Sequence, residues 1–118
     1  HIPSDGEWQT MEISLGMSIA DASSIGWRGS PVGDYLKSTS GWSDNVNGSN
    51  SSGWTGLPGG NRVTDGFGGS NTLGFWWSST SSSEPDYSIY RMLSRWEEGV
   101  ARYDNYSYYG FSARCVRD

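Results

Sequence analysis

The sequence contains one cysteine, Cys115, and one histidine, His1. A single cysteine cannot form a disulfide bond within the chain, and this pair cannot supply the ligand set of a zinc site. A Ser-His-Asp triad needs an imidazole that is held by packing, whereas His1 is the first residue. We therefore expect no zinc centre, no hydrolytic triad and no enzyme activity.

Basic residues are also scarce, because 8 Lys and Arg stand against 13 Asp and Glu, for a net charge of −5. A negatively charged domain repels the phosphate backbone, and no cluster of basic residues offers a local exception, so nucleic acid is not an expected partner. No stretch approaches the roughly 18 consecutive apolar residues of a membrane-spanning helix. We expect no membrane span.

The chain is rich in aromatic residues and glycine. Its 118 residues fit one domain, which buries very roughly two-thirds of the surface that its unfolded chain exposes. Apolar residues make up only 34%, but 7 Trp, 7 Tyr, 3 Phe and 17 Gly indicate an aromatic core within a loop-rich fold. That aromatic content argues against disorder.

Local signals predict helices near the start of the chain. Ser4 and Glu7 have the spacing of a capping box, which predicts a helix over residues 5–15 that ends near Gly16. One apolar stripe of this helix contains Trp8, Met11 and Leu15. A second short helix is predicted over residues 32–37.

The rest of the chain predicts a long loop region and then antiparallel strands. Gly, Ser, Asn and Asp dominate residues 38–73, where buried rings are expected to hold the loops. Strand signals follow at 74–79, in a hairpin of 87–96 with 100–103, and at 111–117. Gly99 is expected at the strained position of the hairpin loop. In the last strand, the inward residues are expected to be Phe111, Ala113 and Cys115.

Helices followed by loops and antiparallel strands indicate an α+β domain. Five stretches, in order, resemble the Fibrobacter succinogenes major paralogous domain, and together they extend along essentially the whole chain. They are residues 1–8, 26–37, 53–62, 76–80 and 110–118. The first and last stretches are also similar to the formylglycine-generating enzymes, which implies a C-type-lectin-like architecture. Those enzymes use cysteine chemistry that Cys115 alone does not supply, so the resemblance implies no activity.

The family resemblance also bears on the start of the chain and on Cys115. Family members usually carry Cys-Pro-x-Gly-Trp directly before the His-Ile-Pro motif, which begins here at His1. The resemblance therefore implies that 1–118 is one domain lacking an N-terminal strand and an upstream cysteine, and that Cys115 pairs with that cysteine or with another chain. The alternative is a buried free thiol beside Phe111 and Ala113.

Several carboxylates lie near the presumed strand ends, and a glycosidase needs only two. They are Glu84, Asp86, Glu97, Glu98 and Asp104. Solvated turn charges are the favoured interpretation. Glu84-Pro85-Asp86 is similar to the triplets with which calcium-dependent lectins hold Ca²⁺ and a sugar, although the companion Trp-Asn-Asp triplet is absent. Asp65, Glu84 and Asp86 are the candidate Ca²⁺ ligands, and we expect no other cofactor.

The segment 96–109 has the composition of a binding surface, because Tyr gives rigid contact area while Ser, Asn and Asp adapt. The candidate binding residues are Trp96, Arg102, Tyr103, Asp104, Asn105, Tyr106, Tyr108 and Tyr109. For Trp96 and Tyr109, burial in the core is an equal alternative. The other tryptophans expected in the core are Trp27, Trp42, Trp54, Trp76 and Trp77.

These observations predict a non-catalytic binding module with a glycan or a protein surface as its partner, for example in adhesion. The family resemblance implies an extracellular or cell-surface location in a bacterium. The alternative is a structural, self-assembling surface or filament subunit, because flat Tyr surfaces suit repeated packing equally well.

Overall fold

The computed structural model describes residues 1–118 and places three short helices before the long strands. The helices are α1 (Asp5–Ser14), α2 (Ile19–Ser23) and α3 (Val32–Leu36), with a single turn of 3₁₀ helix, η1, at Ser43–Asn45. The strands are β1 (Gly26–Arg28), β2 (Asn61–Val63), β3 (Gly66–Gly68), β4 (Leu73–Ser81), β5 (Tyr87–Ser94) and β6 (Val100–Tyr106). The predicted α+β class is confirmed. None of the helices combines the length and the apolar character needed to cross a bilayer.

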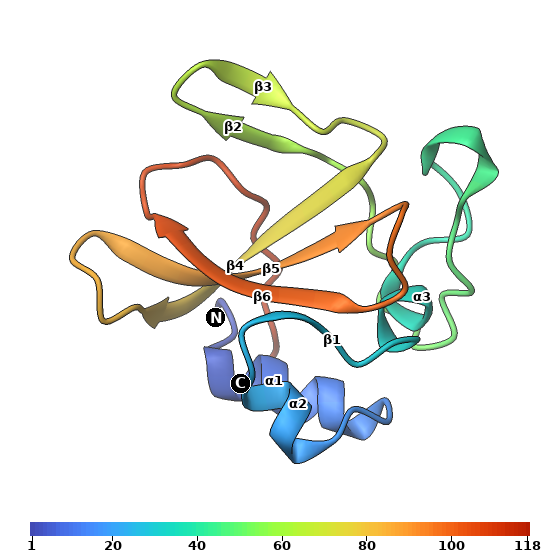
Figure 1. Cartoon of the computed structure of the whole chain (residues 1–118), viewed down its shortest axis with the longest axis horizontal. Helices are drawn as coiled ribbons and strands as arrows, with labels where there is room; N and C mark the ends of the chain where they lie inside the picture. The colour runs from blue at the N-terminus through green and yellow to red at the C-terminus, as the bar shows by residue number, and fades with distance from the viewer.

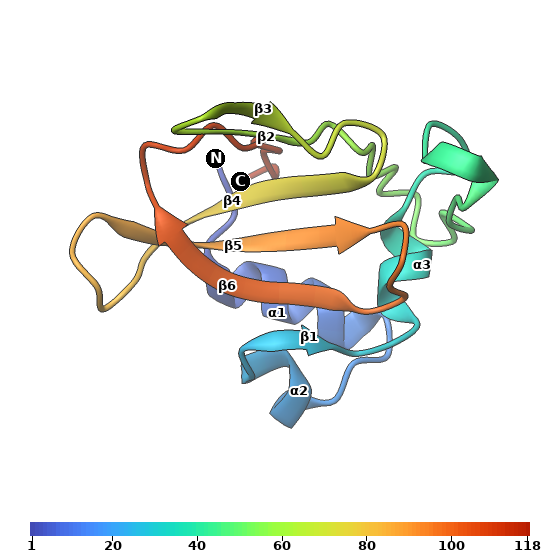
Figure 2. The same cartoon turned by 45° about the horizontal axis from the view of Figure 1, so that its top comes forward.

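A four-stranded antiparallel sheet in the order β1-β6-β5-β4 forms the centre of the molecule (Figure 1). Figure 2 shows α1 and α2 on one side of this sheet and the separate β2–β3 hairpin on the other. The predicted Gly-rich region, 38–73, connects α3 to β4, and its regular elements are only η1 and the β2–β3 hairpin. The sheet therefore has one face toward the helices and one toward the loops.

The capping box fixes the start of α1 as the sequence predicts. The Glu7 amide donates to Ser4 Oγ at 3.2 Å, and the Ser4 amide donates to Glu7 Oε2 at 2.7 Å. The helix buries Trp8 as expected, but it also buries Asp5 and Glu12, which the apolar stripe did not include. The buried face of α1 is therefore partly charged.

The core between α1 and the sheet is aromatic, as the composition predicts. Trp8, Trp54 and Trp76 form a row of edge-on contacts with ring centroids 5.5 and 4.8 Å apart. Trp42 and Trp76 are fully buried, whereas Trp27, Trp54 and Trp77 are half-buried. Around this row pack Met17, Ala22, Val32, Leu36, Leu93 and Val100. Most of the predicted core tryptophans thus have solvent at one edge.

Two local predictions differ from the structure. Helix α2 was not predicted, and it begins at Ser18, whose hydroxyl accepts the Asp21 amide at 3.0 Å. The loop between β5 and β6 runs over residues 95–99, longer than predicted, and Gly99 has no positive φ. A Cβ atom on Gly99 would lie 2.9 Å from the carbonyl oxygen of Arg28, so close packing rather than backbone strain requires glycine there.

The predicted last strand over 111–117 is wrong. The segment crosses from the β2–β3 hairpin to β4 and pairs with each of them at one residue only, so no strand forms. The two isolated bridges join Arg62 with Gly110 and Trp76 with Ser112. Ala113 and Cys115 are exposed, so the interpretation of Cys115 as a buried thiol is also wrong. Near its end, the segment meets the first residue, since the Val116 amide donates to the His1 carbonyl at 2.8 Å.

Candidate binding surface

Four tyrosine rings gather where β5 begins and β6 ends. Tyr87 and Tyr106 are paired across the two strands, with ring centroids 4.5 Å apart. After β6 the chain turns, and Tyr106 stacks on Tyr108 at 5.0 Å while Tyr108 meets Tyr109 edge-on at 5.4 Å. Tyr108 is 70% exposed. We call Tyr87, Tyr106, Tyr108 and Tyr109 the tyrosine cluster.

Backbone hydrogen bonds hold the turn that carries this cluster. The Ser107 amide donates to the Asp86 carbonyl at 2.7 Å, which extends the pairing of β5 and β6 by one residue. The Tyr109 amide donates to the Tyr106 carbonyl at 3.1 Å and closes the turn. Both bonds fix the backbone of the turn before any ligand arrives, which lowers the entropic cost of binding.

Further aromatic rings connect the tyrosine cluster to the loop-side face of the sheet. Tyr109 lies 6.3 Å from Phe111, and Phe111 stacks on Trp77 at 4.3 Å and contacts Tyr90 at 4.9 Å, centroid to centroid. Tyr90 is buried, so this row of rings runs from solvent to the interior. The tyrosine cluster is therefore packed against the aromatic rings of the sheet and is not held by the turn alone.

Hydroxyl and carboxylate groups lie on residues that adjoin the cluster in β5, β6 and the loops at their ends. The Ser88 and Ser107 hydroxyls lie 2.8 Å apart, and the Ser82 hydroxyl donates to the Asp104 carboxylate. A side-chain hydrogen bond with Tyr106 raises the pKa of Tyr87 to about 12, and partial desolvation raises the pKa of Tyr108. Both shifts favour the neutral phenols, which can act as hydrogen-bond donors and acceptors.

The structure brings together only some of the predicted binding residues. Tyr106, Tyr108 and Tyr109 lie in the cluster, and Asp104 and Asn105 lie directly before it in β6. Asn105 Oδ1 accepts the Tyr106 amide at 2.9 Å, so this side-chain oxygen is already engaged. Tyr103 pairs with Tyr90 on the loop-side face and is half-buried, outside the cluster.

Trp96 and Arg102 do not belong to this surface. Trp96 follows β5 at the opposite end of the hairpin, where it is 64% exposed and carries the Arg95 guanidinium 4.8 Å from its ring centroid. The interpretation of Trp96 as a core residue is therefore wrong. Tyr109 is half-buried, which lies between the two predictions for it, a ligand contact and a core residue.

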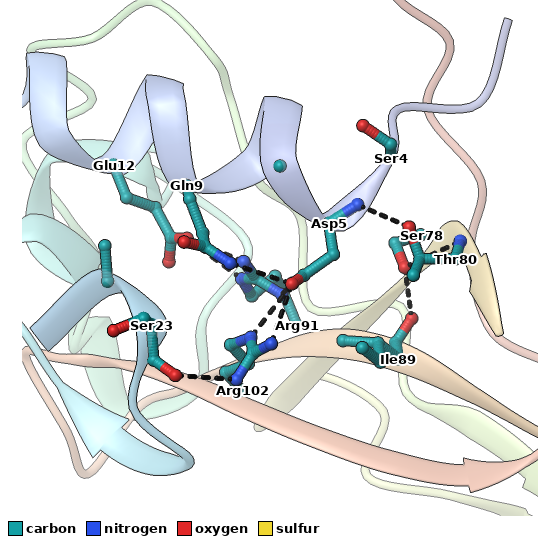
Figure 3. A network of polar contacts seen from close by, with 12 residues as sticks. Ser4, Asp5, Gln9, Glu12, Ser23, Ser78, Thr80, Ile89, Arg91 and Arg102 are labelled. Carbon is teal, nitrogen blue, oxygen red and sulfur yellow. Dashed lines mark hydrogen bonds and ion pairs between the residues drawn. The ribbon is translucent and has the colours of Figure 1, made fainter. Parts of the chain in front are cut away.

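Arg102 points toward α1 and is part of a buried ion network (Figure 3). Its Nη2 lies 2.7 Å from Asp5 Oδ2, and Nη1 donates to the Ser23 carbonyl at 3.0 Å. Arg91 Nη1 pairs with the other oxygen of Asp5 at 2.8 Å. The structure places Arg102 away from the tyrosine cluster, because β-strand alternation turns its side chain to the helix side, where the Asp5 carboxylate already binds it.

Sequence reasoning missed Tyr87, which lies 19 or more positions before the other cluster members. The predicted hairpin was the available signal. Antiparallel pairing of 87–96 with the next strand brings Tyr87, at the start of the first strand, close to the end of the second.

The candidate calcium ligands do not form a cluster. Asp65 lies in the turn between β2 and β3, whereas Glu84 and Asp86 lie between β4 and β5. The chain contains no group of three His, Cys, Asp or Glu side chains placed to hold a metal ion. His1 lies apart from them, with Nε2 2.9 Å from Glu7 and Nδ1 2.5 Å from Asp118.

Comparison with known proteins gives one family. Neither a curated protein nor a solved structure matches the chain. The family model described as the Fibrobacter succinogenes major domain matches residues 1–117. Since that match extends along all but the last residue, the chain belongs to the Fibrobacter succinogenes major domain family.

Proposed function

We propose that this chain is a non-catalytic binding module of a bacterial cell surface or extracellular protein, and that the tyrosine cluster is its contact surface. The observation that carries the proposal is the grouping of Tyr106, Tyr108 and Tyr109 around Tyr87, with Tyr108 70% exposed. Exposed aromatic rings that lie close together, rimmed by polar groups, are typical of interaction sites.

Carbohydrate is the favoured ligand class. The exposed ring of Tyr108 offers a flat apolar face for a sugar ring, and the phenol hydroxyls of the cluster can donate to and accept from sugar hydroxyls. Backbone hydrogen bonds fix the turn and ring–ring contacts restrict Tyr108, so the ordering cost of binding is reduced. A protein surface is the second ligand class, because Tyr-rich patches also bind protein surfaces.

The non-catalytic assignment follows from the positions of the reactive side chains. The His1 imidazole hydrogen-bonds to Glu7 and Asp118, and neither is a hydroxyl or thiol nucleophile. Cys115 is exposed, and its thiol donates no hydrogen bond to a base. A C-type-lectin-like architecture, similar to that of the formylglycine-generating enzymes, is part of the same proposal; it draws support from the order of helices, loops and antiparallel strands and from the meeting of His1 with Val116.

A glycan array with bacterial and plant glycans tests this function. We expect the purified chain to retain a defined set of glycans and the Tyr106→Ala/Tyr108→Ala double variant to lose them. Trp96→Ala is the matched control, because it also removes an exposed aromatic side chain but from the opposite end of the hairpin. Retention of every glycan by the double variant, with its fold intact by circular dichroism, would place binding elsewhere.

Self-assembly is the second candidate, favoured by exposed aromatic side chains on separate elements. Phe67 on the β2–β3 hairpin is 87% exposed and Trp96 is 64% exposed, in addition to Tyr108. Different patches on one chain can pair head to tail and build open assemblies. Size-exclusion chromatography over a concentration series distinguishes the two, since growth of oligomers without ligand supports assembly and a constant monomer supports the binding module.

A further inference from the structure

An apolar pocket lies between α1 and the C-terminal segment, away from the tyrosine cluster. Its volume is about 140 Å³. The walls are made by Pro3, Trp8, Met11, Trp54 and Val116, with Glu7, Arg114 and Cys115 completing the lining. An engineered cavity of about 150 Å³ binds benzene, so this pocket has the capacity for one aromatic ring or branched apolar group.

The charged groups of this pocket differ in what they already bind. Both carboxylate oxygens of Glu7 are engaged, because Oε2 accepts the Ser4 amide at 2.7 Å and Oε1 lies 2.9 Å from His1 Nε2. Arg114, in contrast, has neither an ion pair nor a hydrogen bond to the protein. Its guanidinium is held over the Trp54 ring, with Cζ 5.0 Å from the ring centroid.

Like Arg62 and Arg117, Arg114 has no carboxylate partner, which distinguishes it from the other four arginine residues. The guanidinium groups that face the core or η1 are paired with carboxylates, at distances of 2.5 to 2.8 Å. They belong to Arg28, Arg91, Arg95 and Arg102. Arg114 also borders a second, more polar hollow of about 270 Å³ next to Trp76 and Ser112. Its donors therefore stand between two hollows without a protein acceptor.

We propose that this pocket binds a small organic acid that carries one aromatic or branched apolar group. The apolar group enters the space between Trp8, Met11 and Val116, and the carboxylate accepts hydrogen bonds from Arg114 at the rim. Stacking on Trp54 orients the planar guanidinium, whose paired N–H groups match a carboxylate in geometry. The site is separate from the tyrosine cluster, so it stands or falls independently of the proposed function.

Benzoate is the probe, and NMR chemical shifts of the ¹⁵N-labelled chain are the readout. We expect saturable shifts of the backbone amides of Met11, Trp54 and Val116. Benzyl alcohol has the same ring without the charge, and we expect it to bind at least about tenfold more weakly, because hydrogen bonds to an ionised group are about twice as strong as neutral ones. Equal affinity for the two compounds would contradict recognition through Arg114.

Two variants and two controls sharpen this test. Arg114→Gln should weaken benzoate binding about tenfold or more, since it removes the charge. Val116→Trp keeps the guanidinium but fills the pocket, and it should abolish binding. Arg62→Gln is the matched control, because Arg62 also lies over an aromatic ring, Phe67 at 4.9 Å, but lines neither hollow.

Tyr108→Ala is the second control and should leave benzoate affinity unchanged, whatever it does to glycan binding. The proposal is overturned by either of two results: unchanged benzoate affinity in Arg114→Gln, or the absence of saturable shifts at the solubility limit of benzoate in the unmodified chain.

Discussion

Arg91 Nη2 in β5 lies 2.8 Å from Glu12 Oε1 in α1, and both side chains are completely buried. Arg28 in β1 approaches the same carboxylate, with Nη1 2.7 Å from Oε2. One carboxylate of the first helix thus bridges two guanidinium groups of the sheet, and Asp5 supplies a second negative charge to Arg91. Because a buried charge is tolerated only with a partner, this arrangement fixes how α1 docks on the sheet.

Replacing Glu12 tests this dependence. Glu12→Gln keeps the shape of the side chain but leaves the buried Arg28 without a carboxylate partner and Arg91 with Asp5 alone. Removing one partner of a buried pair costs about 3–5 kcal/mol, so we expect a loss of this size in the free energy of unfolding measured with urea. Glu98→Gln, at an exposed position, should change it by less than about 0.5 kcal/mol. Equal stability of the two variants would show that the pair does not hold α1.

A second prediction concerns the pH dependence of stability through Asp5. Burial raises the pKa of this carboxyl, but hydrogen bonds from Arg102 and Arg91 outweigh burial and hold the pKa well below its ordinary value. A depressed pKa in the folded state stabilises the fold above the pKa of the unfolded chain, near about 3.9, and this contribution is lost as the pH falls below it. We expect the unmodified chain to lose stability on acidification from pH 5 downward.

Asp5→Asn isolates the contribution of that carboxyl, since the amide does not titrate. The variant should be less stable than the unmodified chain at neutral pH, and the difference in unfolding free energy should shrink toward low pH. Urea titrations at a series of pH values measure it. A difference that stays constant from neutral to acidic pH would contradict the assignment of the acid loss to Asp5.

The local parts of this fold could be predicted and the distant pairings could not. The capping box between Ser4 and Glu7 needs only neighbouring residues, and it fixed the start of α1 correctly. Burial of Asp5 depends on Arg91 and Arg102, which lie 86 and 97 positions later, and no periodicity reports such partners. The apolar stripe predicted for α1 therefore included neither Asp5 nor Glu12.

The binding surface shows the same division. Composition identified the segment containing Tyr106, Tyr108 and Tyr109, because a high density of Tyr among small polar residues is a local property. Strand alternation, however, turns the Arg102 side chain to the helix side of the sheet, away from the tyrosine cluster. Trp96 lies at the far end of the β5–β6 hairpin from the cluster. Both depend on register and strand length, which the sequence pattern indicates only within a few residues.

A third prediction concerns the C-terminal segment, which has no regular structure but carries a core ring. Phe111 stacks on Trp77 at 4.3 Å and on Phe75 at 4.9 Å. Since Phe111 is half-buried, we expect Phe111→Ala to lower the unfolding free energy by about 2–3 kcal/mol, less than the 3–5 of a fully buried ring. Tyr108→Ala, three residues earlier and mostly exposed, should cost less than about 0.5 kcal/mol. A loss for Phe111→Ala as small as that for Tyr108→Ala would mean that the segment is not part of the core.

The last prediction concerns Gly33, where α3 meets the loop between β5 and β6. The Gly33 amide donates to the Glu98 carbonyl at 2.7 Å, and a Cβ atom on Gly33 would lie 2.1 Å from the carbonyl oxygen of Gly99. Backbone conformation does not require glycine here, since its φ is not positive. Lack of space alone excludes a side chain, and the obstructing atoms are backbone atoms that cannot rotate away.

Gly33→Ala and Gly6→Ala make a matched pair, because both add one methyl group within a helix. In Gly33→Ala the loop must move, and we expect a loss of at least about 2 kcal/mol in unfolding free energy, within the range for overpacked cores. In Gly6→Ala the new methyl group would meet only Ser4 Oγ at 3.9 Å, so the higher helix propensity of alanine should add about 0.5–1 kcal/mol. Thermal or urea unfolding of both variants measures the difference. Stabilisation of both would contradict the close approach of α3 to the β5–β6 loop.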